Sequence, residues 1–95
     1  MTTRPPRVTM AVLDILDALS NAPADDPPWG LRLCEMTGLG SGTVYPALER
    51  MAAAGWVTDR LEEPQPTDRP RRRYFTITDE GQAVRKQAVA RWRQS

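Results

Sequence analysis

Histidine is absent from this chain of 95 residues, and cysteine occurs only once, at Cys34. Without histidine there is no Ser-His or Cys-His nucleophile pair, no zinc site of the usual nitrogen and sulfur type, and no acid-base switch near neutral pH. None of the carboxylates lies in a glycine-rich or apolar stretch that would indicate a tuned catalytic pair. The sequence therefore predicts no enzyme, no metal site and no cofactor.

Long apolar runs are missing too. No stretch approaches the roughly 20 apolar residues that cross a membrane, and the N-terminal "MTTRPPRVTM" has charge but no apolar segment behind it. One cysteine cannot close an intramolecular disulfide, which fits a reducing compartment. We expect a cytoplasmic protein with no membrane partner, in which Cys34 is a small apolar side chain rather than a redox switch.

Positive charge is concentrated toward the end of the sequence. Residues 1–68 carry five basic and ten acidic side chains, whereas residues 69–95 carry eight basic and two acidic ones, so the net charge of +1 conceals an asymmetry. A chain of this length forms one domain with a modest core, and a partner surface often completes the burial of such a core. A dimer is therefore expected.

Hydrophobic periodicity predicts two helices before residue 39. "TMAVLDILDALS" begins with Thr9, a good N-cap, and repeats apolar residues at helical spacing until "NAPADDPP" ends it. A shorter helix is expected in "WGLRLCEMTG", with Trp29, Leu33 and Met36 on one face and Gly38 as its C-terminal stop.

A third helix is expected in "SGTVYPALERMAAAG", capped by Ser41 and ended by Gly55. Its apolar residues Val44, Leu48 and Met51 repeat at helical spacing. The connection "GLGS" has the length of the turn in a helix-turn-helix.

The period then changes to that of strands. "WVTDRLEE" and "RRRYFTIT" are predicted to pair as a hairpin around the proline-containing "PQPTDRP". A lone hairpin is not stable, so the face carrying Phe75 and Ile77 should pack on the helices, and Trp56 is expected in the core.

The last segment, "DEGQAVRKQAVARWRQS", predicts a helix from Asp79 to Gln94, with Asp79 and Gln82 at capping-box spacing. Its apolar stripe consists of Val84, Ala88 and Trp92, with Val89 beside it. The predicted fold is mainly α with a β-hairpin wing, in the order α-α-α-β-β-α. We expect a winged helix-turn-helix DNA-binding domain over residues 1–78 and a dimerisation helix over residues 79–95.

"GLGSGTVYPALERMAAAGWV" followed by "RPRRRYFTITDEG" resembles the PadR family of bacterial transcriptional regulators, from about Val8 to Gly81. The shared features are Tyr-Pro inside the recognition helix and an arginine-rich return strand. The resemblance implies a winged helix-turn-helix that dimerises through its C-terminal helix and represses transcription from an operator. Where the family usually has Tyr-Gly-Tyr, this chain has Trp29, Gly30 and Leu31, and its C-terminal segment stops after one helix, as in the family's short members.

The start of the third helix is the candidate for reading DNA. The side away from its apolar stripe carries small and polar residues that permit close approach to a major groove: Ser41, Gly42, Thr43, Tyr45, Pro46 and Arg50. Amides at that end also point toward phosphates. The alternative is that Tyr45 only packs against the second helix and that Pro46 marks a late helix start.

Four arginines, Arg69, Arg71, Arg72 and Arg73, directly precede and open the return strand. No acidic residue occurs from Arg69 to Thr78, so these like charges are expected to need an anion from outside the stretch. Guanidinium groups bind phosphate bidentately, and such contacts weaken as salt rises. The alternative is a solvated run of charge at a loop tip.

The C-terminal stripe of Val84, Ala88, Val89 and Trp92 is the candidate dimer seam or effector pocket, because a terminal helix has little of its own domain left to pack on. Packing on the first helix of the same chain is the alternative. In the resembled family, effectors are planar or hydrophobic molecules that in some members bind between aromatic side chains at the dimer interface. Trp92 is thus a candidate for stacking on an effector or for simple packing.

The leading hypothesis is a homodimeric, sequence-specific repressor that binds a palindromic operator in double-stranded DNA and is released by a small hydrophobic or aromatic effector. A winged-helix protein-interaction module without specific DNA binding is the alternative. A metal-sensing regulator is disfavoured because the chain has too few cysteines and histidines.

Overall fold

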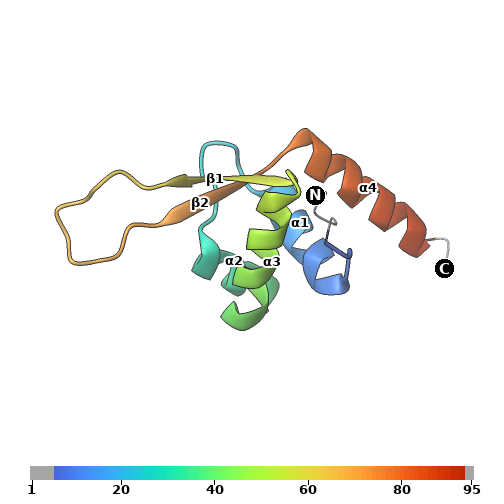
Figure 1. The fold of residues 1–95 in the computed structure, drawn as a ribbon, viewed down its shortest axis with the longest axis horizontal. Coiled ribbons are helices and arrows are strands. Elements are labelled where there is room, and N and C mark those ends of the chain that lie inside the picture. Colours follow the sequence, from blue (N-terminus) through green and yellow to red (C-terminus); the bar gives the residue numbers. More distant parts are fainter. Residues whose placement is uncertain (1–5, 94–95) are drawn as a thin grey trace.

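The computed structural model describes residues 6–93 of the chain. In chain order, its elements are α1 (Met10–Asn21), α2 (Gly30–Thr37), α3 (Ser41–Ala53), β1 (Val57–Leu61), β2 (Arg73–Ile77) and α4 (Asp79–Arg93). The predicted order α-α-α-β-β-α and the winged-helix class are confirmed. In Figure 1 the hairpin and α4 project in opposite directions from the group formed by α1, α2 and α3.

Helix α1 is the centre of the core. Thr9 is its N-cap, and the Thr9 hydroxyl accepts a hydrogen bond from the Val12 amide at 3.2 Å, as its sequence position predicts. The apolar stripe buries Ile15 and Leu16 completely. Because α1 contacts α2, α3, α4 and β2, its stripe joins every layer of the domain.

The turn between α2 and α3 follows local rules. Gly38 ends α2 in the left-handed region, with φ of 75°, and its amide donates to the Cys34 carbonyl at 2.8 Å. The predicted Ser41 cap is wrong. Gly40 is the N-cap of α3, its carbonyl accepts from the Thr43 and Val44 amides at 3.0 Å each, and Ser41 is the first helical residue.

Pro46 lies inside α3, so a late helix start at Pro46 is also wrong. Proline lacks the N–H that would bond the carbonyl four residues earlier, which belongs to Gly42. The helix tolerates this loss because Gly42 is exposed, and water can reach that carbonyl. The proline therefore costs little at a position one turn from the helix start.

Strands β1 and β2 pair antiparallel, with Val57 opposite Ile77 and Asp59 opposite Phe75. Phe75 is 1% exposed and Ile77 is packed against the core, so the predicted inward face of the hairpin is confirmed. Trp56, just before β1, is buried as expected. The base of the hairpin packs on the helices, and residues 62–72 extend away from them (Figure 1).

Helix α4 begins differently from the prediction. Its cap is Thr78, whose hydroxyl accepts from the Gly81 amide at 3.0 Å and donates to the Gly55 carbonyl at 2.7 Å. The capping box of Asp79 and Gln82 is wrong, because the Gln82 side chain accepts from Ser20 of α1 instead. The predicted last residue of this helix, Gln94, lies outside the described residues.

A close backbone approach locates the start of α4. A Cβ on Gly81 would collide with the Trp56 carbonyl oxygen and lie 2.9 Å from Ile77 Cγ1.

Among residues 6–93, no helix combines the length and apolar character that a membrane crossing requires.

Candidate nucleic-acid interface

Helix α3 carries the candidate base-reading residues on its exposed side. The six residues predicted there are all exposed: Ser41, Gly42, Thr43, Tyr45, Pro46 and Arg50. The opposite side of the helix is anchored in the core by Val44, Ala47, Leu48 and Met51. The fold therefore presents the predicted residues together, and their contact with DNA stays a prediction.

Tyr45 faces the wing side of α3 and touches α2. A Cβ on Gly30 would lie 2.5 Å from Tyr45 Cε1 and 2.6 Å from its hydroxyl oxygen, so any larger residue there would displace the ring from this position. Tyr45 nevertheless remains 39% exposed. Packing on the second helix, the alternative role considered for this residue, and availability to a ligand are both compatible with this placement.

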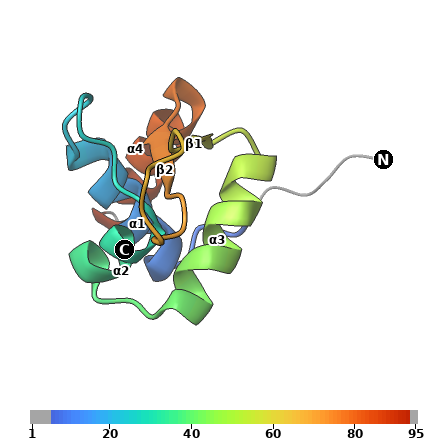
Figure 2. The same ribbon diagram turned by 90° about the vertical axis from the view of Figure 1, so that its left-hand side faces the viewer.

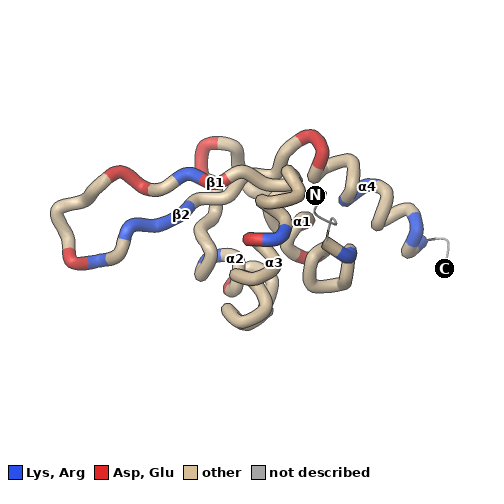
Figure 3. Tube along the Cα trace, in the orientation of Figure 1, with Lys and Arg blue, Asp and Glu red and all other residues tan. Residues whose placement is uncertain are grey.

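The wing is the β1–β2 hairpin with its connecting residues 62–72, and its two halves, here called limbs, differ in charge: the limb leading into β2 is basic and the limb following β1 is mixed. Figure 3 shows the arginines along the limb that leads into β2, while acidic residues lie on the limb that follows β1. Antiparallel pairing brings the two limbs together, and this changes the electrostatics that the sequence suggested.

For two of the four arginines, the anion from outside the stretch is a carboxylate of the same chain rather than a phosphate. Arg69 forms an ion pair with Glu62 at 3.0 Å. Arg73 forms two, with Asp59 at 2.8 Å and with Glu49 of α3 at 2.7 Å. The prediction considered only carboxylates within the arginine stretch, whereas these three come from the opposite limb and from α3.

Glu62 is the anionic centre of the wing. Its carboxylate accepts from Arg69, from the Tyr74 hydroxyl at 2.9 Å and from the Arg72 amide at 3.3 Å. The hydrogen bond from Arg69, followed by that from Tyr74, lowers the pKa of Glu62 from 4.5 to about 2. The same carboxylate raises the pKa of Arg69.

Arg73 joins the wing to the recognition helix. Its Nε donates to Asp59 of β1 and its Nη1 to Glu49 of α3, and these hydrogen bonds raise its pKa. Its guanidinium carbon also lies 5.2 Å from the centre of the Phe75 ring. Arg73 is therefore positioned as a structural link as much as a ligand for phosphate.

The other two arginines have different surroundings. Arg71 donates through Nε to the backbone carbonyl of Glu62 at 2.8 Å, and no carboxylate in the described part of the chain pairs with its charge. Arg72 stacks on Trp29, with its guanidinium carbon 3.9 Å from the ring centre. Trp29 in turn lies edge-on to Tyr74, with ring centres 6.1 Å apart and an interplanar angle of 88°.

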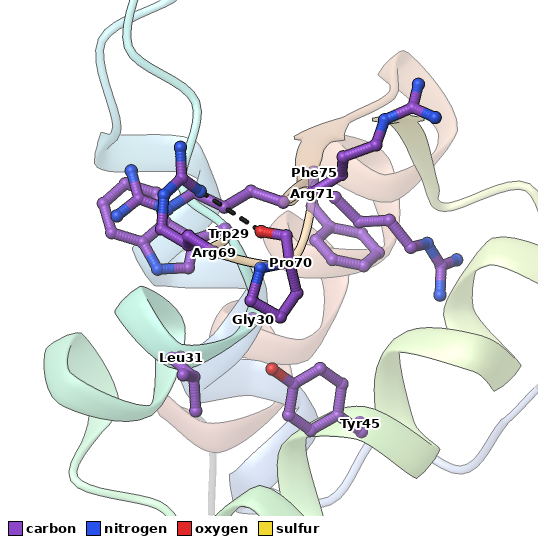
Figure 4. Close-up of a pocket in the computed structure, with 10 residues that line it drawn as sticks. Trp29, Gly30, Leu31, Tyr45, Arg69, Pro70, Arg71 and Phe75 are labelled. Carbon is purple, nitrogen blue, oxygen red and sulfur yellow. Dashed lines mark hydrogen bonds between the residues drawn. The ribbon is translucent and has the colours of Figure 1, made fainter. Parts of the chain in front are cut away.

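A cleft of about 330 Å³ lies between α3, the start of α2 and the wing. Its lining consists of Trp29, Gly30, Leu31, Tyr45, Phe75 and residues 69–73. Figure 4 shows Leu31 and Tyr45 on opposite sides of this cleft, with Arg71 and Phe75 farther toward the wing. The cleft brings Tyr45, one of the predicted residues of α3, together with the four predicted arginines of the wing.

Sequence reasoning did not assign Trp29, Gly30 or Leu31 to this site. The available sign was the departure of these residues from the Tyr-Gly-Tyr of the resembled family. Their contribution depends on the segment before α2 running along β2, where the Phe75 amide donates to the Pro28 carbonyl at 2.9 Å and Trp29 bridges to Tyr74. No local pattern predicts that pairing.

The second predicted site, on α4, is divided between the core and the surface. Val84 packs against the core and Ala88 is 7% exposed, so both contact their own chain. Val89 is half-buried, whereas Trp92 is 43% exposed and borders a small cavity of about 80 Å³ with Val8 and Gln87. Arg85 and Asp17 add an ion pair between α4 and α1 at 3.3 Å.

These features define a class of protein. Three helices around one core, a short turn before an exposed third helix, and a basic hairpin beside that helix form a winged helix-turn-helix. Figure 2, seen along the wing, shows α2 below the hairpin and α3 beside it. Such a surface suits binding to the DNA backbone together with readout of a groove.

The sequence profile of the transcriptional regulator PadR-like family matches residues 32–87. The chain belongs to this family, and the resemblance seen in the sequence is confirmed. As a member, it is a DNA-binding transcriptional regulator. A comparison with curated protein sequences gave no significant match.

Solved structures share the fold. A PadR family regulator from Clostridium difficile R20291 is 21% identical with a TM-score of 0.72, over 90% of this chain and 88% of that one. A PadR family regulator from Eggerthella lenta is 23% identical with a TM-score of 0.73, over 86% and 70%. BpsR of Bordetella bronchiseptica, whose DNA binding is regulated by 6-hydroxynicotinic acid, is 23% identical with a TM-score of 0.71, over 93% and 58%.

Proposed function

We propose that this regulator binds a palindromic operator in double-stranded DNA as a homodimer and represses transcription in the cytoplasm. The observation that carries the proposal is the cleft in which Tyr45 of α3 and the arginines Arg71 and Arg72 of the wing meet. Exposed residues of α3 would read base edges in the major groove. The wing would bind phosphates, which supplies affinity and register but no choice of sequence.

Dimerisation is proposed to use residues 79–95. Trp92 is a large aromatic side chain left exposed near the end of α4, and a second copy of the helix would cover it. A two-fold dimer would place two α3 helices on half-sites about one helical turn apart, which a palindrome provides. Residues 1–78 would then form the DNA-binding unit.

Release by a small hydrophobic or aromatic effector is the last part of the proposal. The exposed ring of Trp92 at the proposed seam offers a stacking surface for a planar molecule. The structural relative BpsR, which is regulated by 6-hydroxynicotinic acid, supports an aromatic ligand as the first class to test. Binding at a seam would change the relation of the two protomers and so the fit to both half-sites.

Selection of bound duplexes from a random pool, at defined salt, tests the proposal. We expect an enriched palindrome whose half-site spacing reports the dimer geometry. Sedimentation of the free protein and of Trp92→Asp, which would bury a charge at the proposed seam, checks the oligomeric state. Failure to enrich any sequence would favour the protein-interaction module instead.

A further inference from the structure

Arg72 differs from its neighbours in how its side chain is held. Arg69 and Arg73 form ion pairs with carboxylates, and the Nε of Arg71 donates a hydrogen bond to a backbone carbonyl. Among residues 6–93, no oxygen accepts a hydrogen bond from the Arg72 guanidinium. This group keeps its full charge and all of its N–H donors.

The Arg72 backbone is fixed on both sides. Its amide donates to the Glu62 carboxylate at 3.3 Å, and its carbonyl accepts from the Glu62 amide at 2.7 Å. The side chain then extends over Trp29, where the guanidinium lies 3.9 Å from the ring centre. A stacked guanidinium uses its face for the ring and leaves its edge, where the N–H groups point, open to a bidentate anion.

Trp29 is itself held in place. It bridges to Tyr74, and its ring meets the Tyr74 ring edge-on. The Tyr74 hydroxyl donates to Glu62, the residue that fixes the Arg72 backbone. The stack is therefore supported from both the start of α2 and the wing.

We propose that Trp29 is a positioning residue for DNA binding: it holds the Arg72 guanidinium so that its edge meets one backbone phosphate at the mouth of the cleft. The proposal rests on the proposed DNA-binding function and adds a residue to it. Restricting the rotamers of a long side chain before binding reduces the entropy lost on contact. Without the indole, Arg72 would reach the same phosphate from a freely rotating state.

A double-mutant cycle tests this with a mixed-sequence duplex, because phosphate contacts do not depend on the bases. The proteins are the wild type, Trp29→Ala, Arg72→Ala and the double variant, and fluorescence anisotropy gives Kd over a salt series. Trp29→Ala should weaken binding about three- to tenfold, because one long side chain would then have to be ordered on binding. In the Arg72→Ala background it should have almost no further effect, since its partner is gone.

Three controls separate positioning from a structural role. Trp29→Tyr keeps an aromatic face and should bind nearly as the wild type does, whereas Trp29→Leu keeps apolar bulk and should bind as Trp29→Ala does. The effect of Trp29→Ala should persist in an Arg71→Ala background. A general collapse of the wing would also persist in the Arg72→Ala background, because it would disturb the remaining DNA contacts.

The outcomes are distinct. If the wild type binds no duplex, the proposed function fails and this inference with it. If the wild type binds with the usual salt dependence but Trp29→Ala equals it, or the two substitutions are additive, only the positioning role is refuted. If Trp29→Ala does not fold, the comparison of Trp29→Leu with Trp29→Tyr gives the same decision.

Discussion

The wing arginines should fall into two pairs when their contribution to the salt dependence of DNA binding is measured. Arg69 and Arg73 each form ion pairs with carboxylates of the same chain, whereas within residues 6–93 Arg71 and Arg72 form none. A net-neutral ion pair neutralises no phosphate charge and releases no counterion from DNA. We therefore expect Arg71→Ala/Arg72→Ala to flatten the salt slope and Arg69→Ala/Arg73→Ala to leave it nearly unchanged.

The magnitude follows from the number of free cations. A slope of about −0.9 per phosphate contact gives about −3.6 for two contacts in each wing of a dimer, against about −7.2 for four. Between about 50 and 200 mM salt, these wing contributions correspond to losses of about 150-fold and about 20,000-fold in affinity. The predicted losses for two and for four phosphate contacts per wing thus differ by about 150-fold over this range of salt.

Anisotropy titrations of the selected duplex at several salt concentrations measure the slopes directly. Thermal unfolding of each variant checks that the fold is retained. An equal loss of slope in both double variants would refute the reasoning. It would mean that Glu62, Asp59 and Glu49 release their arginines when DNA binds.

Three further predictions concern single side chains. The pKa of Glu62 in the folded state is about 2, below its ordinary 4.5, so the stability that its charge adds is present above about pH 4.5 and is lost as pH falls toward 2. The difference in Tm between wild type and Glu62→Gln should therefore vanish over that range. A constant difference would contradict the assignment. Gly81→Ala should destabilise the fold by about 1–3 kcal/mol in denaturant unfolding, because the added Cβ meets a backbone carbonyl. Gly42→Ala should stabilise the fold, because Gly42 is helical and an added Cβ would meet open space. The same sign for both variants would refute the clash. Gly30→Ala should displace the half-exposed Tyr45 ring, lowering DNA affinity with little change in Tm, and its effect should not add to that of Tyr45→Ala.

The architecture was predictable because its determinants are local. Thr9 caps α1, Gly38 ends α2 in the left-handed region, and Phe75 and Ile77 alternate onto the buried face. Each feature depends on a few neighbouring residues and on the period of helix or strand. Cap positions shifted where two residues competed, as when Thr78 rather than Asp79 capped α4.

The electrostatics of the wing could not be predicted in the same way. The partners of Arg69 and Arg73 are distant in sequence, and only the strand register and the approach of α3 bring them close. The stack of Arg72 on Trp29 likewise depends on the segment before α2 lying along β2. A count of charges within one stretch shows where cations are plentiful but not which of them are free.

The link made by Arg73 has a consequence for control. Its ion pairs connect β1, β2 and the Glu49 side of α3, so the wing and α3 are already linked before any DNA is bound. The contact of Tyr45 with Gly30 adds α2 to the same unit. In the proposed homodimer, an effector would then act by changing the distance between the two DNA-binding units rather than by deforming either of them.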